Sequence, residues 1–230
     1  KTDLSQNDAW IYDDFESARQ QAERSKKPMM VVFRWIPWHA CEGFDGQVVR
    51  REGELAKLLD QFICVRLVKA NDIDLTLFQF DFDLTFSVFF MNADKTIYGR
   101  FGTRSSRENA EQHMTSPGLE AALNGALAIH RDLENQRATL TNKQPVDSKF
   151  RSPDDYPSLA GKYTSDLAYQ GAVTKSCLHC HQVRDAERQI YRDAGKPIPD
   201  QLLFPYPLPS TIGMKMDPNS KGRIKSVITG

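Results

Sequence analysis

The feature that most constrains this chain is a five-residue motif, Cys177-Leu178-His179-Cys180-His181. Cys-x-x-Cys-His is the sequence to which c-type heme is attached. Two thiols three residues apart on one helical turn reach the two vinyl groups of one porphyrin, and the following His181 can ligate the iron. Because the chain has only 4 Cys and 5 His in 230 residues, a chance match is rare. The sequence therefore predicts one covalent heme c on Cys177 and Cys180, with His181 as the proximal iron ligand.

Zinc binding, a redox dithiol and chance occurrence are the alternatives to heme attachment at this motif. Zinc sites normally have four protein ligands, and no second Cys or His pair lies at an obvious spacing. A redox dithiol normally follows an apolar strand and opens a helix, whereas residues 168–176 lack the composition of a buried strand. We favour heme because the helix expected after His181 carries an apolar stripe that can form one wall of a heme site.

The sixth ligand of the iron is less constrained by the sequence. Met214 and Met216 follow a Pro-rich stretch beyond the motif, as in small cytochromes with a distal Met, although both also suit a terminal β-hairpin. His130 lies on the apolar side of its expected helix, where a histidine is more often a core residue than a ligand. His113 and His39 fall in expected loops. Met214 and His130 are thus our main distal candidates, and an open iron position is the alternative.

Charge and composition exclude several classes of protein. Lys and Arg total 30, as do Asp and Glu, so the chain lacks the basic excess typical of nucleic-acid binders. Apolar residues make up 40% of the chain, which is enough for a packed core. No run of 18 apolar residues occurs, so we expect no membrane span. The chain opens on Lys1 without a signal-like segment, and we expect a processed mature protein.

Helix and strand patterns alternate over the first 135 residues. Asp13 and Glu16 form an expected capping box, and Ser116-Pro117 is a typical helix start. Apolar periodicity and turn residues predict helices over 13–26, 47–59 and 116–133, and strands over 29–33, 62–68, 86–91 and 96–101. This order predicts an α/β domain over residues 8–135.

The rest of the chain has a different pattern. Residues 135–158 are polar and contain three prolines, which predicts a linker leading into a helical region around 156–169. A helix follows Cys177 and ends at Gly195, and its apolar stripe is Val183, Ala186, Ile190 and Ala194. Prolines then keep the chain extended before two short strands. We therefore expect a mostly α-helical heme segment with long loops over 136–210 and a β tail over 211–230.

The segment from Arg34 to Cys41 joins an expected strand to an expected helix. This junction and the element order resemble the thioredoxin fold, in which the same turn carries Cys-x-x-Cys. Here the turn reads Trp38-His39-Ala40-Cys41, so the attacking thiol is absent, and Thr85-Phe86 stands where that fold has a cis-proline. We expect a thioredoxin-like scaffold without thiol chemistry. A lone reactive thiol at Cys41 is the alternative, and Cys64 is expected in the core.

Three segments together resemble the secreted bacterial thioredoxin-like/PDZ (seleno)protein family: Val31 to Cys41, Phe90 to Gly102, and the Cys177–His181 motif. The resemblance implies that the position of Trp38 commonly holds Cys or selenocysteine, from which this chain departs. The tail, Ile212–Asp217 and Gly222–Gly230, resembles the opening strands of a PDZ domain.

These observations lead to one functional hypothesis and two alternatives. The hypothesis is a monoheme c-type cytochrome on a redox-inactivated thioredoxin-like scaffold, which transfers single electrons to or from a redox partner protein. The alternatives are a heme-based sensor or small-ligand binder with an open iron site, and a thiol-dependent redox protein using Cys41. An electron carrier or heme-binding protein is favoured over an enzyme. Since c-type heme is attached outside the cytoplasm, we expect a periplasmic or otherwise exported protein.

Overall fold

The computed structural model describes residues 9–33, 42–51, 53–68, 73–78, 86–103, 114–140, 145, 147–162, 180–203, 214–216 and 224–227. The chain divides into two compact units, residues 1–183 and residues 184–230. None of the helices in these described ranges combines the length and apolar character needed to cross a bilayer.

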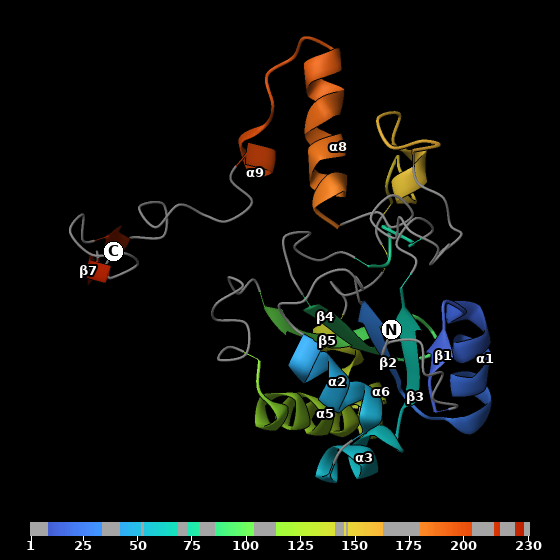
Figure 1. Ribbon diagram of the computed structural model, residues 1–230. Coiled ribbons are helices and arrows are strands. Elements are labelled where there is room, and N and C mark those ends of the chain that lie inside the picture. The colour runs from blue at the N-terminus through green and yellow to red at the C-terminus, as the bar shows by residue number, and fades with distance from the viewer. Residues whose placement is uncertain are drawn as a thin grey trace. The chain divides into compact units, whose positions relative to one another are not determined.

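A five-stranded mixed sheet forms the centre of the first unit (Figure 1). Its strands run in the order β1-β3-β2-β4-β5. The first three are parallel to one another, and β4 and β5 are antiparallel to their neighbours. The strands are β1 (Ile11–Tyr12), β2 (Met29–Phe33), β3 (Ile63–Leu67), β4 (Phe86–Met91) and β5 (Ile97–Thr103).

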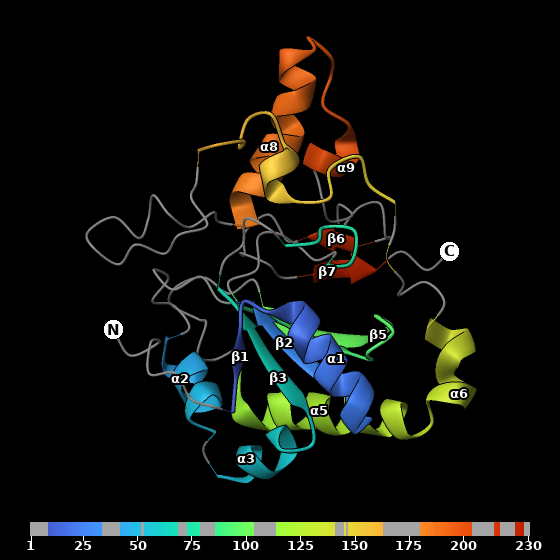
Figure 2. The same cartoon turned by 90° about the vertical axis from the view of Figure 1, so that its right-hand side faces the viewer.

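Helices cover both faces of this sheet (Figures 1 and 2). Every residue of β2 and β4 is buried, which explains why these strands are continuous apolar runs rather than alternating ones. α1 covers one face, and α2, α3 and α5 cover the other. The helices of this unit are α1 (Phe15–Ser25), α2 (Glu42–Arg50), α3 (Glu54–Leu59), α5 (Ser116–Arg131) and α6 (Leu133–Gln136), followed by the 3₁₀ helix η3 (Arg137–Leu140).

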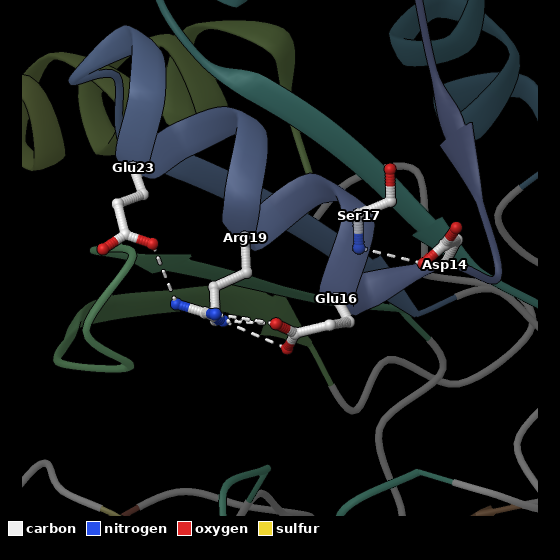
Figure 3. Close-up of polar contacts among 5 residues, drawn as sticks. All are labelled: Asp14, Glu16, Ser17, Arg19 and Glu23. Atoms are coloured by element: carbon white, nitrogen blue, oxygen red, sulfur yellow. Dashed lines mark hydrogen bonds and ion pairs between the residues drawn. The ribbon is translucent and has the colours of Figure 1, made fainter.

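The start of α1 differs from the expected capping box by one residue. Asp14, not Asp13, caps the helix, and its carboxylate accepts a hydrogen bond from the Ser17 N–H at 2.9 Å (Figure 3). The Asp13 carboxylate instead accepts from the backbone N–H of Val68 at 2.7 Å. Along the same helix, Arg19 pairs with Glu16 at 2.7 Å and with Glu23 at 3.4 Å. Because these pairs are largely exposed, they contribute little to stability.

The hairpin of β4 and β5 forms as expected, with a turn over residues 92–95. Its far end depends on Gly102. A Cβ atom at this position would lie 2.2 Å from the backbone oxygen of Phe86, which is far inside van der Waals contact. Glycine is therefore required by the close approach of the two strands.

Residues 147–162, most of which were expected to be a linker, have a defined structure within the first unit. The 3₁₀ helix η4 (Pro153–Asp155) begins there, and the Asp155 carboxylate accepts backbone hydrogen bonds from Arg151 at 2.9 Å and Ser152 at 2.8 Å. Tyr156 and Leu159 are buried. The backbone N–H of Leu75 donates to the Arg151 oxygen at 2.7 Å, which ties this segment to the connection between β3 and β4.

α8 (Cys180–Asp193) begins in the first unit and continues into the second, which also contains α9 (Asp200–Leu203), β6 (Met214–Met216) and β7 (Ile224–Val227). Gly195 follows α8 with φ 60°, so the expected glycine stop is confirmed. Arg188 on α8 donates to the Leu202 oxygen on α9 at 2.9 Å. β6 and β7 pair as the expected antiparallel hairpin.

Candidate functional site

The carboxyl ends of the three parallel strands define one edge of the sheet. β1, β2 and β3 end there at Tyr12, Phe33 and Leu67. Ligands of open α/β sheets bind beyond this edge, since loops and helix N-termini gather there. α2 begins at Glu42, nine residues after the end of β2. The expected Cys-x-x-Cys position, Trp38 to Cys41, therefore falls between β2 and α2.

The residues of that turn lie outside the described part of the chain. This holds for Trp38, His39 and Cys41, and also for Thr85. Phe86 is the first residue of β4 and is buried. The structure describes the elements on either side of this turn, β2 and α2. In the sequence, Cys41 directly precedes α2. A thiol just before a helix N-terminus has the helix dipole available to stabilise its thiolate.

A buried ion pair joins α2 to the sheet. Arg66 of β3 donates to both carboxylate oxygens of Asp45 of α2, at 2.8 and 3.0 Å, and each side chain is only 1% exposed. The Trp10 ring lies 5.6 Å from the Arg66 guanidinium, and its indole N–H donates to the Val49 oxygen at 3.2 Å. Asp45 lies in the first turn of α2 and Val49 in its last, so these contacts hold both ends of the helix, against β3 and against Trp10, which directly precedes β1.

Sequence patterns alone do not reveal this ion pair. The available signal was an arginine within the otherwise apolar run from Phe62 to Val68. A charge in a strand that is buried on both faces needs a buried partner. The identity of that partner, Asp45, follows only once α2 is placed over β3.

Cys64 is a core residue, as expected. It is free, it is buried, and its Sγ lies 3.6 Å from the Leu59 oxygen. Burial raises the pKa of the Cys64 thiol to about 12. A thiol with such a pKa is not a nucleophile at neutral pH, so Cys64 is not a candidate for thiol chemistry.

Ser87 is a buried hydroxyl at the same end of the sheet. It lies second in β4, in register with Phe33 of β2 and Gly102 of β5. Among the described residues, its Oγ is buried without a hydrogen-bond partner. This end of the sheet thus contains a buried polar atom that no described residue satisfies.

The Cys-x-x-Cys-His motif lies at the start of α8. Cys180 is the first residue of this helix and His181 the second, while Cys177 lies outside the described residues. Val183 and Ala186, about one and two turns further along α8, are buried. Two thiols at this spacing can attach a porphyrin covalently, and the adjacent imidazole can ligate its iron; a helix that starts at the second cysteine is compatible with this arrangement. Among the described residues, no group of three His, Cys, Asp or Glu is suited to a metal ion.

Residues 10–93 match a family model described as thioredoxin-like. The strand order and directions of the sheet agree with that match. This part of the chain is a thioredoxin-like domain. The match covers the thioredoxin-like part of the expected resemblance and does not reach the motif at 177–181 or the tail. No curated protein matches the chain significantly.

His130 belongs to the helix that covers the sheet of the thioredoxin-like domain, and both of its ring nitrogens are engaged. Nε2 lies 2.9 Å from the Lys26 oxygen and donates to it, and Nδ1 lies 2.6 Å from the Tyr98 hydroxyl oxygen, from which a neutral imidazole accepts. Burial raises the pKa of Tyr98, which keeps that hydroxyl protonated. Iron ligation by His130 would require one of these bonds to break, so the geometry favours a structural role.

The other distal candidates are placed only in part. Met214 is the first residue of β6 and pairs in register with Val227, and Met216 ends the same strand. His39 and His113 lie outside the described residues. The hydrogen bonds to Lys26 and Tyr98 therefore explain the position of His130, and Met214 stays a predicted distal ligand of the heme iron.

Proposed function

We propose that this protein is a one-electron redox carrier in which a thioredoxin-like domain accompanies a covalent c-type heme. Cys177 and Cys180 would hold the porphyrin through thioether bonds, and His181 would ligate the iron. The observation that carries the proposal is the intact Cys-x-x-Cys-His spacing, supported by a helix that begins at Cys180. A thioredoxin-like domain fits a redox-related role.

The chain's own residues would set the properties of the bound group. Heme supplies one-electron oxidation and reduction of its iron, and the protein supplies the axial ligand, the dielectric and the docking surface. His181 would fix the proximal side. The buried Val183 and Ala186 mark the side of α8 that is withdrawn from water. An apolar environment of this kind disfavours the more highly charged ferric state.

Intact mass in denaturant tests the covalent attachment. Protein matured in an export-competent host should gain the mass of one heme. Cys177→Ser and Cys180→Ser should weaken or abolish attachment, whereas Cys41→Ser, the matched control, should leave it intact. Recovery of the bare polypeptide mass from the native chain would refute the proposal.

Optical spectra test the iron ligand and separate electron transfer from sensing. His181→Ala should change the ligand-field spectrum, and His179→Ala within the same motif should not. If two strong protein ligands hold the iron, carbon monoxide will leave the ferrous spectrum unchanged, as expected for an electron carrier. A rapid change on adding carbon monoxide would favour the sensor or small-ligand alternative.

We also propose that the protein acts in the periplasm or another exported location, because heme attachment to this motif takes place outside the cytoplasm. Fractionation of the producing cells, with a cytoplasmic enzyme as a marker, tests this. Recovery of the heme-loaded protein with the cytoplasmic marker would contradict it.

A thiol-dependent redox role is the second candidate. The thioredoxin-like fold of residues 10–93 favours it, and Cys41 directly precedes α2. The presence of Trp38 in place of an attacking cysteine weighs against it. Under this alternative, Cys41→Ser abolishes the thiol-dependent redox activity of the protein, while heme attachment is unaffected.

A further inference from the structure

The chain that follows α8 turns back along this helix. Gly195, with φ 60°, ends the helix, and α9 then lies beside α8 rather than beyond it (Figures 1 and 2). Arg188 of α8 makes the contact, because its Nε donates to the backbone oxygen of Leu202 at 2.9 Å. A hydrogen bond from a charged donor is stronger than one between neutral groups. This bond therefore stabilises the position of α9 against α8.

The helical register places this contact on the same side of α8 as the backbone of His181. An α-helix has 3.6 residues per turn and rises 1.5 Å per residue. Arg188 follows His181 by seven residues, so the two Cα atoms lie within about 20° of each other around the helix axis and about 10 Å apart along it. Arg184 lies between them on this side, and its side chain is only 13% exposed. The returning chain therefore runs along the side of α8 that carries the motif's histidine.

The last residue of α9 is an apolar side chain that is open to solvent. Leu203 is 41% exposed. One exposed leucine needs no explanation by itself, but the place of this one is informative. It directly follows the residue that Arg188 holds, about two helical turns along α8 from His181. A porphyrin attached at Cys180 extends over a comparable distance, and because its faces are apolar, they are stabilised by contact with apolar side chains.

We propose that α9 covers part of the heme, with Leu203 packed against the porphyrin and Arg188 as the positioning residue that holds α9 in place. This inference rests on the proposed function, because it requires the heme on Cys177 and Cys180. The apolar shell around a metal site controls the access of water and, through it, the reduction potential. The cover therefore raises the reduction potential of the iron.

Intact mass in denaturant separates a failure of this inference from a failure of the proposed function. If the native chain carries no heme, both are refuted. If the native chain and the variants below carry one heme each, the measurements that follow refute or support the cover alone.

The reduction potential of the heme-loaded protein tests the contact of Leu203. Leu203→Ser should lower the potential, because water then reaches the porphyrin and stabilises the more highly charged ferric state. Val227→Ser is the matched control, because Val227 is another exposed apolar residue, on β7, and is 62% exposed. It should leave the potential unchanged. An unchanged potential in Leu203→Ser, or an equal fall in both variants, would overturn the cover.

A comparison with the heme-free chain tests whether Leu203 packs against the porphyrin itself. Leu203→Ala should raise the unfolding equilibrium constant of the heme-loaded protein about tenfold more than that of the heme-free Cys177→Ser/Cys180→Ser chain, because only the former has a porphyrin for Leu203 to contact. Urea unfolding measures both, and the potential of Leu203→Ser provides a second test that does not need the heme-free chain to fold. Equal effects of Leu203→Ala in the two proteins would overturn the contact.

The positioning role of Arg188 has its own test. Arg188→Met removes the bond to the Leu202 oxygen and should lower the reduction potential, whereas Arg188→Lys, which keeps a charged donor, should restore most of the loss. Arg192→Met is the matched control for the loss of charge, because the Arg192 guanidinium bonds to Gln189 within α8.

Combining Arg188→Met with Leu203→Ser should lower the potential no further than either variant alone, because both act on one contact. A loss of charge without a change in the cover would add to the effect of Leu203→Ser. Additive shifts, or equal shifts in Arg188→Met and Arg192→Met, would overturn the positioning role.

Discussion

The ion pair between Arg66 and Asp45 is the residue-level feature that holds α2, the helix that follows the Trp38–Cys41 position, against the sheet. It lies between α2 and the sheet, directly after the segment that ends at Cys41. Burying two charges costs more than an apolar pair of the same size would, and the cost is recovered only when the pair is intact. The pair therefore stabilises the packing of α2 on the sheet only when both charges are present, which we call the anchor model.

Removing one member of this pair should destabilise the protein strongly. Arg66→Met removes the arginine that pairs with the buried Asp45 carboxylate, and we expect a loss of about 3–5 kcal/mol in the free energy of unfolding. The double variant with Asp45→Leu should recover most of this loss. Urea unfolding measures both, with Lys57→Met, an exposed ion-pair residue, as the control. A double variant as unstable as the single one would contradict the anchor model.

Asp94 predicts a pH dependence of stability. Burial acts to raise the pKa of Asp94, but hydrogen bonds from Thr96 and Arg137 outweigh it and lower the pKa below the ordinary 3.8. A carboxyl whose pKa is lower in the folded state stabilises the protein at neutral pH, and this contribution is lost as the pH falls through the folded pKa. Asp94→Asn should therefore be less stable than the native chain at pH 7, with the difference shrinking in acid. A constant difference across the titration, with Asp185→Asn as the charge control, would argue against this.

At the level of elements, the sequence predicted what depends on local patterns. The buried strands 29–33 and 86–91 were predicted at their observed bounds, because continuous apolar runs are their signal. Helix caps were displaced by one residue, since Asp13 and Asp14 are adjacent acceptors. The expected helix 47–59 is two helices, α2 and α3, interrupted at Gly53 with φ 61°. β1, with two residues, has too little pattern to predict.

Gly102 offers a test of how closely β4 and β5 must approach. Gly102→Ala places a Cβ against the Phe86 oxygen, so the strands must separate, and we expect a loss of about 1–3 kcal/mol. Gly99→Ala in the same strand is the matched control, because no atom lies within 4 Å of its added Cβ. Thermal unfolding followed by circular dichroism compares the two. Equal melting temperatures would show that the hairpin tolerates the separation.

At the scale of the whole molecule, the sequence predicted the order of the strands and helices around the candidate site better than the side-chain contacts between them. The thioredoxin-like arrangement follows from element order, and the match to residues 10–93 supports it. The Arg66–Asp45 pair and the bond from Leu75 to Arg151 join residues 21 and 76 positions apart. Such contacts depend on how elements pack, which periodicity does not encode. The Cys177–His181 motif is visible in sequence because its chemistry is confined to five consecutive residues.

The last prediction concerns the disulfide reductase activity that we expect this thioredoxin-like domain to lack, and it tests whether Trp38 is the cause. We expect the native chain to reduce insulin no faster than added dithiol alone. The reason is that Trp38 occupies the position of the attacking cysteine, so Cys41 has no second thiol to act with. The position lies in the sequence between the end of β2 and the start of α2, which is where the thioredoxin fold carries its dithiol. Trp38→Cys should therefore introduce measurable reductase activity, and adding Cys41→Ser should remove it. A native rate comparable to that of an ordinary thioredoxin, abolished by Cys41→Ser, would instead establish a single-thiol redox enzyme.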